Sequence, residues 1–367
     1  MSYDITQKKH IILFIVMKKL LLILTMALCV STVSAQIYPD AGENWRNAKP
    51  SKYDFNNKKI KSLKKYIVDS MKTTGLMVIV GGECIYKFGN VERLSYIASC
   101  RKSVLSMLYG KYVENGTINL NQTIGELGIT DHGGLLPIEK TATVRHLIQA
   151  RSGIYRPSSN PGSSLDNPDL VPKRGSKKPG TYHLYNNWDF NAAGTVFEKL
   201  TGKSVYQAFE EDLAKPLGFQ DWDINAQRYG GDKSKSMHPA YHIYISTRDM
   251  ARLGYLMLRK GEWDGKQIIS KKWHKEMLTK WTPRKKMNPA EQRKGEFAYG
   301  YMWWLYDTKV PELKGAYTAR GAMGQYITVI PALDMVIAHK TDRVYQRKTP
   351  RAKYAKMVEM IVSAKTK

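Results

Sequence analysis

Hydrophobic and polar residues alternate with two different periods along this chain, and the periods predict both helices and strands. Apolar residues recur at helical spacing over Ile60–Met71 with lysines between them, which predicts an amphipathic helix. Two short β-prone runs follow, Leu76–Val80 and Ile85–Phe88, and the Gly81-Gly82-Glu83 between them is typical of a hairpin turn with positive φ. A second helix, predicted for Cys100–Val113, has so many apolar positions that we expect it to be largely buried.

The middle of the chain, from about residue 117 to 237, has a different composition. It is rich in Gly, Pro, Asn and Ser, above all over residues 157–179, and these residues favour loops. Helical periodicity returns only over Val144–Ala150 and Asn191–Leu200. We therefore expect a loop-rich, mostly helical lobe.

The last third of the chain returns to regular patterns. A helix is predicted for Thr247–Lys260, a hairpin for Tyr326–Ile330 and Met335–His339, and a closing helix for Ala352–Ala364. Helices thus bracket strands that come from both ends of the chain. This order predicts an α+β fold, in which an antiparallel sheet is flanked by helices and the helical lobe of residues 117–237 is inserted into it.

The first 35 residues have the pattern of a secretory signal peptide. Lys18-Lys19 precedes the apolar run Leu20–Val30, and small residues lead up to Ala35. We expect cleavage after Ala35 and a periplasmic or secreted protein, with an N-terminal extension over 36–59 and the main domain over 60–367. The alternative is a membrane anchor, against which the two lysines count, since they interrupt the apolar stretch.

Composition and charge narrow the class of protein. The 367 residues are 43% hydrophobic and 25% charged, which indicates a globular fold and excludes a disordered chain or a multi-span membrane protein. The net charge of +26 favours contact with an anionic cell envelope. No module with interleaved stacking aromatics is visible, so we expect no nucleic-acid partner. The cysteines and histidines lack metal-ligand spacing, and a bridge between Cys84 and Cys100 stays open.

Ser99 and Lys102 form the first chemical motif, a Ser-x-x-Lys at the start of the predicted buried helix. Residues three apart share one face of a helix, so Lys102 can reach the Ser99 hydroxyl. Apolar neighbours would partly desolvate the lysine and favour its neutral form, which can accept a proton. Taken alone, the motif is far more often that of an N-cap serine beside a surface lysine.

Tyr185 and Asn187 form the second motif, a Tyr-x-Asn before the helix predicted from Asn191. The phenol can carry a proton to and from a serine, and the amide can bind a substrate carbonyl or hold the lysine. Together with Ser99 and Lys102, in this order, these residues resemble the serine β-lactamase and penicillin-recognising superfamily. Further matching stretches extend the resemblance over about residues 60–361, and it is strongest to the class C, esterase and 6-aminohexanoate-dimer hydrolase branch.

The resemblance implies a role for each matching residue. Ser99 would be the nucleophile, Lys102 its proton acceptor or electrostatic support, Tyr185 the acid and base, and Asn187 a ligand of the substrate. The oxyanion hole would consist of the backbone N–H groups of Ser99 and Ala322, with Gly321 beside it. This mechanism requires neither a metal nor another cofactor.

Two departures from the superfamily pattern bear on the substrate. The third motif is usually Lys-Thr-Gly or His-x-Gly, whereas residues 317–321 here read Tyr-Thr-Ala-Arg-Gly, with no lysine or histidine in that place, and Arg320 is the candidate to substitute for it. A separate deacylating glutamate is also not recognisable. We therefore expect a serine hydrolase of small carboxylic esters or amides. The alternatives are transfer of the acyl group to an alcohol, a β-lactamase or D-Ala-D-Ala carboxypeptidase, and a non-catalytic envelope-binding protein.

Overall fold

The structure, a computed structural model, describes residues 14, 17–18, 36–162, 164–344 and 347–366. Contacts divide the chain into two units, Met1–Ile37 and Tyr38–Lys367. Most of the predicted signal peptide, with its cleavage site after Ala35, lies outside the described residues. Within the described ranges, no helix combines the length and the apolar character that crossing a membrane requires.

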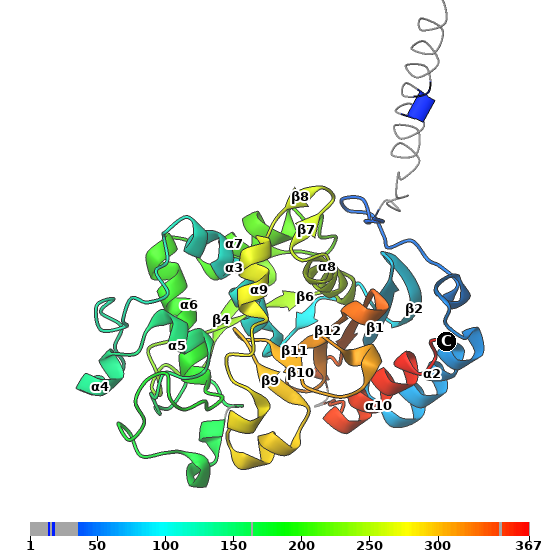
Figure 1. Ribbon diagram of the computed structural model, residues 1–367. Helices are drawn as coiled ribbons and strands as arrows, with labels where there is room; N and C mark the ends of the chain where they lie inside the picture. Colours follow the sequence, from blue (N-terminus) through cyan, green and yellow to red (C-terminus); the bar gives the residue numbers. More distant parts are fainter. Residues whose placement is uncertain (1–13, 15–16, 19–35, 163, 345–346, 367) are drawn as a thin grey trace, which may run out of the picture. The chain divides into compact units, whose positions relative to one another are not determined.

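The second unit is organised around one seven-stranded antiparallel sheet (Figure 1). Its strand order is β2-β1-β13-β12-β11-β10-β9, so the hairpin from the start of the domain pairs with strands from its end. The strands are β1 (Gly75–Val80), β2 (Glu83–Gly89), β9 (Phe297–Tyr299), β10 (Trp304–Tyr306), β11 (Tyr317–Gly321), β12 (Gln325–Ile330) and β13 (Met335–Lys340). Three small two-stranded ladders use β3 (Ser95–Tyr96) with β6 (Tyr244–Ile245), β4 (Arg228–Gly230) with β5 (Ala240–His242), and β7 (Glu262–Trp263) with β8 (Lys266–Gln267).

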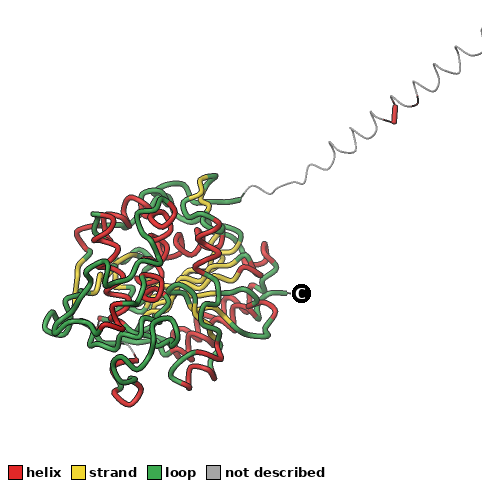
Figure 2. The backbone as a smooth tube through the Cα atoms, turned by 60° about the vertical axis from the view of Figure 1, so that its left-hand side comes forward, coloured by secondary structure: helices red, strands yellow, loops and turns green. Residues whose placement is uncertain are grey.

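Helices cover both faces of the large sheet, and Figure 2 shows its strands running through the middle of the domain. On one face α2 (Asn57–Ser70) packs beside α10 (Arg351–Val362), and on the other α8 (Thr247–Leu258) packs against β13, β12 and β1. Residues of β1 alternate between two hydrophobic clusters accordingly, since successive side chains of a strand point to opposite faces. This arrangement confirms the predicted α+β fold with an antiparallel sheet flanked by helices.

The mostly helical lobe lies beside the sheet. It contains α4 (Pro137–Lys140), α5 (Val144–Ile148), α6 (Asn187–Thr201) and α7 (Val205–Phe209), joined by loops and short 3₁₀ turns. α3 (Cys100–Glu114) is buried along most of its length and contacts α6 and α7 as well as β11 and β12, and α9 (Lys271–Met277) packs on it. α3 therefore joins the lobe to the sheet.

One helix begins earlier than the hydrophobic pattern predicts. α6 starts at Asn187 rather than at Asn191, because Asn186 acts as its N-cap and its side chain accepts a hydrogen bond from the Trp188 N–H. The apolar periodicity does not register a polar first turn. As a result, Asn187 is held in the first turn of a helix rather than in a loop.

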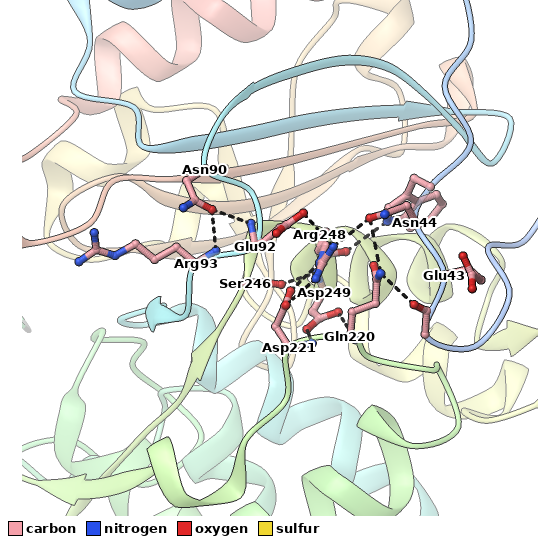
Figure 3. A network of polar contacts seen from close by, with 12 residues as sticks. Glu43, Asn44, Asn90, Glu92, Arg93, Gln220, Asp221, Ser246, Arg248 and Asp249 are labelled. Carbon is pink, nitrogen blue, oxygen red and sulfur yellow. Dashed lines mark hydrogen bonds and ion pairs between the residues drawn. The ribbon is translucent and has the colours of Figure 1, made fainter.

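Residues 38–59, predicted as an N-terminal extension, belong to the same contact unit as the rest of the domain. Arg248, in the first turn of α8, lies at the centre of the polar network that attaches them (Figure 3). Its guanidinium pairs with both carboxylate oxygens of Asp221 at 2.6 Å, and it also donates to Asn44 at 2.9 Å and to Glu92 at 3.1 Å. Arg248 thus joins the start of α8 to three other segments of the chain, which contain Asn44, Glu92 and Asp221.

Candidate active site

Ser99 lies directly before the first residue of α3, and the backbone around it is tightly constrained. Ala98 has a positive φ of 48°, a conformation unfavourable for a residue with a side chain. Gly321, at the end of β11, packs against this segment so closely that a Cβ there would lie 2.5 Å from the carbonyl oxygen of Ile97. Any larger residue at position 321 would therefore displace the chain that carries Ser99.

Lys102 is fully buried one turn into α3, and both of its partners are the residues that the sequence singled out. Its Nζ donates to the Tyr185 hydroxyl at 2.6 Å and to Asn187 Oδ1 at 2.5 Å. Burial, and then the positive charge of Arg101, hold the pKa of Lys102 well below its usual value of 10.5. A neutral amine at this position can accept a proton, as the apolar surroundings of α3 predicted.

Tyr185 lies between Lys102 and Ser99, and its surroundings favour the protonated phenol. Burial raises the pKa of Tyr185 to about 12, although its hydrogen bond with Ser99 and the charges of Arg101 and Arg320 act in the opposite direction. The ring packs against Phe190 at 4.9 Å between centroids. The hydroxyl thus lies where it can carry a proton between a serine and a buried amine.

Asn187 has an orientation fixed by its other contacts. Its Nδ2 donates to the backbone carbonyls of Pro161 at 2.9 Å and Asn160 at 3.3 Å, which leaves Oδ1 to face Lys102. The same side chain therefore connects the lysine to the loop over residues 157–179.

A pocket of about 360 Å³ opens over Ser99 and Tyr185. Arg320, Gly321 and Ala322 also line it, while Lys102 and Asn187 are joined to the pocket through the bond of Lys102 to Tyr185, so the structure brings together every residue predicted for the site. Within the described residues, the N–H groups of Ser99 and Ala322 donate to no backbone carbonyl. Two free N–H groups beside a serine at a helix N-terminus can stabilise an oxyanion.

Arg320 is held by two aromatic rings at one wall of this pocket. Its guanidinium lies 4.6 Å from the ring centroid of Phe297 and 4.4 Å from that of Trp304. Burial, reinforced by the charge of Arg351, lowers the pKa of Arg320 to about 10, so the group stays protonated at neutral pH. The pocket wall therefore carries a positive charge directly before Gly321.

Several lining residues were not singled out from the sequence. Among them are Arg351, at the first turn of α10, and Gln292 and Tyr326, while Gly162 and Ser164 belong to the loop predicted over residues 157–179. Gln292 and Arg351 come from segments that showed no motif. The start of α10 lies near the site because both ends of the domain contribute to one sheet, and this shared sheet was the only sequence prediction that pointed to that region.

The structure also shows the state of the cysteines and the placement of possible metal ligands. Cys84 and Cys100 are buried free thiols, so the two are not bridged. In the ranges that the structure describes, no group of three or more His, Cys, Asp or Glu side chains is placed to hold a metal ion.

Comparisons with known proteins identify the family. The family model described as Beta-lactamase matches residues 64–358. An uncharacterized protein of Alkalihalophilus pseudofirmus is 24% identical over 265 residues, covering 66% of this chain and 71% of the relative. The D-alanyl-D-alanine-carboxypeptidase/endopeptidase AmpH of Escherichia coli is 26% identical over 137 residues, which covers 34% of this chain and only 35% of the relative.

The fold is also that of solved structures. A putative 6-aminohexanoate-dimer hydrolase from Bacillus anthracis superimposes with a TM-score of 0.65 at 21% identity, over 89% of each chain. The resemblance seen in the Ser-x-x-Lys and Tyr-x-Asn motifs therefore extends to the whole domain, and the chain belongs to the Beta-lactamase family.

Proposed function

We propose that this protein is a serine hydrolase that acts on small carboxylic esters or amides through an acyl-enzyme on Ser99. One observation carries the proposal: a fully buried lysine with a lowered pKa bonds to the tyrosine that in turn bonds to Ser99. No carboxylate pairs with this lysine within the described residues, so no ion pair stabilises its charged form. What distinguishes Lys102 from a structural buried lysine is that its partner is the phenol that bonds to Ser99.

The arrangement supports two half-reactions with the same residues. In the first, the Ser99 hydroxyl passes its proton to the Tyr185–Lys102 pair while Oγ attacks the substrate carbonyl, and the N–H groups of Ser99 and Ala322 stabilise the resulting oxyanion. The intermediate collapses to an ester on Ser99, and Tyr185 returns the proton to the leaving alcohol or amine. In the second, water gives a proton to the same pair while its oxygen attacks the ester; the bond between the acyl carbon and Ser99 Oγ then breaks, Tyr185 returns the proton to Oγ, and the acid leaves.

Transfer to an alcohol and action on D-alanyl peptides are the alternatives within this mechanism. An alcohol could replace water in the second half-reaction, with the same proton route. The E. coli relative is named a D-alanyl-D-alanine-carboxypeptidase, but the match covers about a third of either chain. The absence of the usual lysine or histidine from residues 317–321 favours esters and amides over β-lactams as natural substrates.

Intact-mass spectrometry after brief exposure to a short-chain p-nitrophenyl ester, an amide or a penicillin tests the proposal. We expect an ester adduct that forms and decays on the wild type, and none on Ser99→Ala. Ser106→Ala is the matched control, because Ser106 is buried on the same helix but does not line the pocket. A lasting penicillin adduct would instead indicate a peptidoglycan enzyme. Absence of any adduct would favour a non-catalytic binding protein.

We further propose that the protein is exported and contacts an anionic cell envelope. Lys58, Lys61 and Lys64 are exposed on α2 and form no ion pair within the described residues, which supports an electrostatic role for this helix. The triple Lys→Gln variant should bind phosphatidylglycerol vesicles more weakly at low salt than a variant with Lys173, Lys177 and Lys178 changed in the same way. Equal binding by both would oppose the proposal.

Export is tested separately, by N-terminal sequencing of the expressed protein. Cleavage after Ala35 should leave Gln36 as the first residue.

A further inference from the structure

The last two residues of β13, His339 and Lys340, are ionisable and buried, with relative exposures of 0% and 1%, while the four residues before them in the strand are apolar. Burying such groups is costly unless their polar atoms are bonded. Because successive strand residues point to opposite faces, the two side chains reach different segments. Each of these segments carries one of the two N–H groups that face the pocket.

His339 holds the turn between β11 and β12, in which Ala322 lies. Its Nδ1 lies 2.8 Å from the carbonyl oxygen of Gly324, and its Nε2 lies 2.8 Å from the Thr73 hydroxyl. Burial lowers the pKa of His339 to about 4, so the ring is neutral. A neutral ring satisfies both contacts when Nδ1–H donates to Gly324 and Nε2 accepts from Thr73.

The turn needs such support because its backbone is unfavourable. Met323 has a φ of 66° and Gly324 a φ of 104°. Besides His339, the Thr349 N–H fixes the turn by donating to the Met323 carbonyl at 3.0 Å. Ala322 directly precedes these two residues, so the direction of its N–H depends on the contacts that hold them.

Lys340 holds the segment that leads into Ser99. Its Nζ donates to the carbonyl oxygen of Ser95 at 2.9 Å and to that of Ile245. These two residues are opposite each other in the β3–β6 ladder, which continues through a bond from the Ile97 N–H to the Ile243 carbonyl. Ala98, with its positive φ, and then Ser99 follow immediately.

We propose that His339 and Lys340 are positioning residues that fix, from the end of a single strand, the two backbone N–H groups of the oxyanion hole. The inference rests on the proposed function, because it assumes that an oxyanion forms beside Ser99. In this arrangement one strand, β13, holds both donors in place: His339 fixes the turn that contains Ala322, and Lys340 fixes the segment that leads into Ser99. The distance between the two donors is then determined by neighbouring residues of one strand.

Substitutions at His339 separate this role from simple packing. The side-chain amide of His339→Asn can replace Nδ1 as the donor to Gly324, whereas that of His339→Gln lies nearer to the position of Nε2 and Thr73. We expect His339→Asn to keep kcat within about threefold of wild type. We expect His339→Gln and Lys340→Met to lower kcat by about 10- to 100-fold, less than the 10²- to 10³-fold loss that follows removal of an oxyanion donor.

The diagnostic measurement is the affinity for a boronic acid, which forms a tetrahedral anionic adduct with an active serine and so resembles the transition state. In His339→Gln and Lys340→Met its inhibition constant should rise by the same factor by which kcat falls, with KM within about twofold of wild type. Thr328→Val is the matched control, since it removes buried hydroxyl contacts to Thr318 and Tyr354 from the neighbouring strand. It should lower the melting temperature and leave kcat and boronate affinity unchanged.

The outcomes distinguish the inference from the proposed function. If the wild type forms no ester on Ser99, the proposed function fails. If the wild type acylates normally but His339→Gln and Lys340→Met keep wild-type kcat and boronate affinity, the positioning role is refuted and the function stands. Equal losses in His339→Asn and His339→Gln would also refute it, because only one of them keeps the donor to Gly324.

Discussion

Removing a single oxygen atom from Tyr185 tests the proton route more directly than any other change. Tyr185→Phe keeps the ring and its packing on Phe190 and Trp304, and deletes the hydroxyl that accepts from Lys102 Nζ at 2.6 Å and bonds to Ser99. The lysine keeps its bond to Asn187 at 2.5 Å, so we expect the buried amine to stay in place. The variant therefore separates proton transfer from the architecture of the site.

The size of the effect follows from the role of the hydroxyl. Loss of a positioned acid and base lowers a rate by about 10²- to 10⁴-fold, which is about 3 to 5 kcal/mol of activation free energy. Both half-reactions use the same hydroxyl, so acylation and deacylation should slow together. KM should change little, because the deleted atom acts mainly in the transition state.

Stopped-flow measurement of p-nitrophenol release resolves the two steps as a burst followed by a steady rate. Tyr299→Phe is the matched control: its ring is buried and lies 6.3 Å from that of Tyr185, but no hydrogen bond joins Tyr299 to Lys102 or Ser99 within the described residues. It should stay within about threefold of wild type. The reasoning is refuted if Tyr185→Phe also stays within that range, or if both variants lose activity equally.

Three further predictions concern pH, substrate charge and stability. The value of kcat/KM should rise with pH through the pKa of Lys102, at a midpoint well below 10.5, because burial and Arg101 favour the neutral amine. Lys102→Met should lose both the activity and this pH dependence. A midpoint near 10.5 would contradict the prediction. Arg320→Met should lower kcat/KM about 10- to 100-fold for esters that bear a carboxylate and less than threefold for neutral esters, with both kinds of ester measured in parallel. Equal losses for the two kinds would show that the charge of Arg320 does not bind the substrate. Ser152→Ala removes a hydroxyl that donates to buried Asp189 at 2.5 Å, so the free energy of unfolding measured in urea should fall by about 1 to 3 kcal/mol. The control Ser62→Ala changes an exposed serine and should lower it by less than about 0.5 kcal/mol.

Hydrophobic periodicity was sufficient for most of the framework. The predicted helix over Ile60–Met71 corresponds to α2, and the predicted hairpins correspond to β1–β2 and β12–β13 with shifts of a few residues. These elements have one apolar face or a continuous apolar run, which is the feature that periodicity detects. Short strands such as β3 and β6 were not predicted, because two residues cannot show a period.

The catalytic motifs were recognisable because each places two functional groups within one turn of chain. Ser99 and Lys102 share a helix face, and Tyr185 and Asn187 flank the start of another helix. Their mutual contact was expected only from the resemblance, since nothing in local spacing determines that residues more than eighty positions apart meet. The sequence likewise predicted a desolvated Lys102, because its apolar neighbours are adjacent in α3.

Residues that act through the backbone of distant segments leave no such signal. His339 and Lys340 looked like the polar end of a strand, and the sequence prediction stopped that strand at His339. Their partners are carbonyl oxygens, which every residue possesses, so no residue type at the other end marks the contact. The oxyanion donors proposed for this site are also backbone atoms, so motif analysis cannot find the groups that would fix their geometry, and only the fold reveals them.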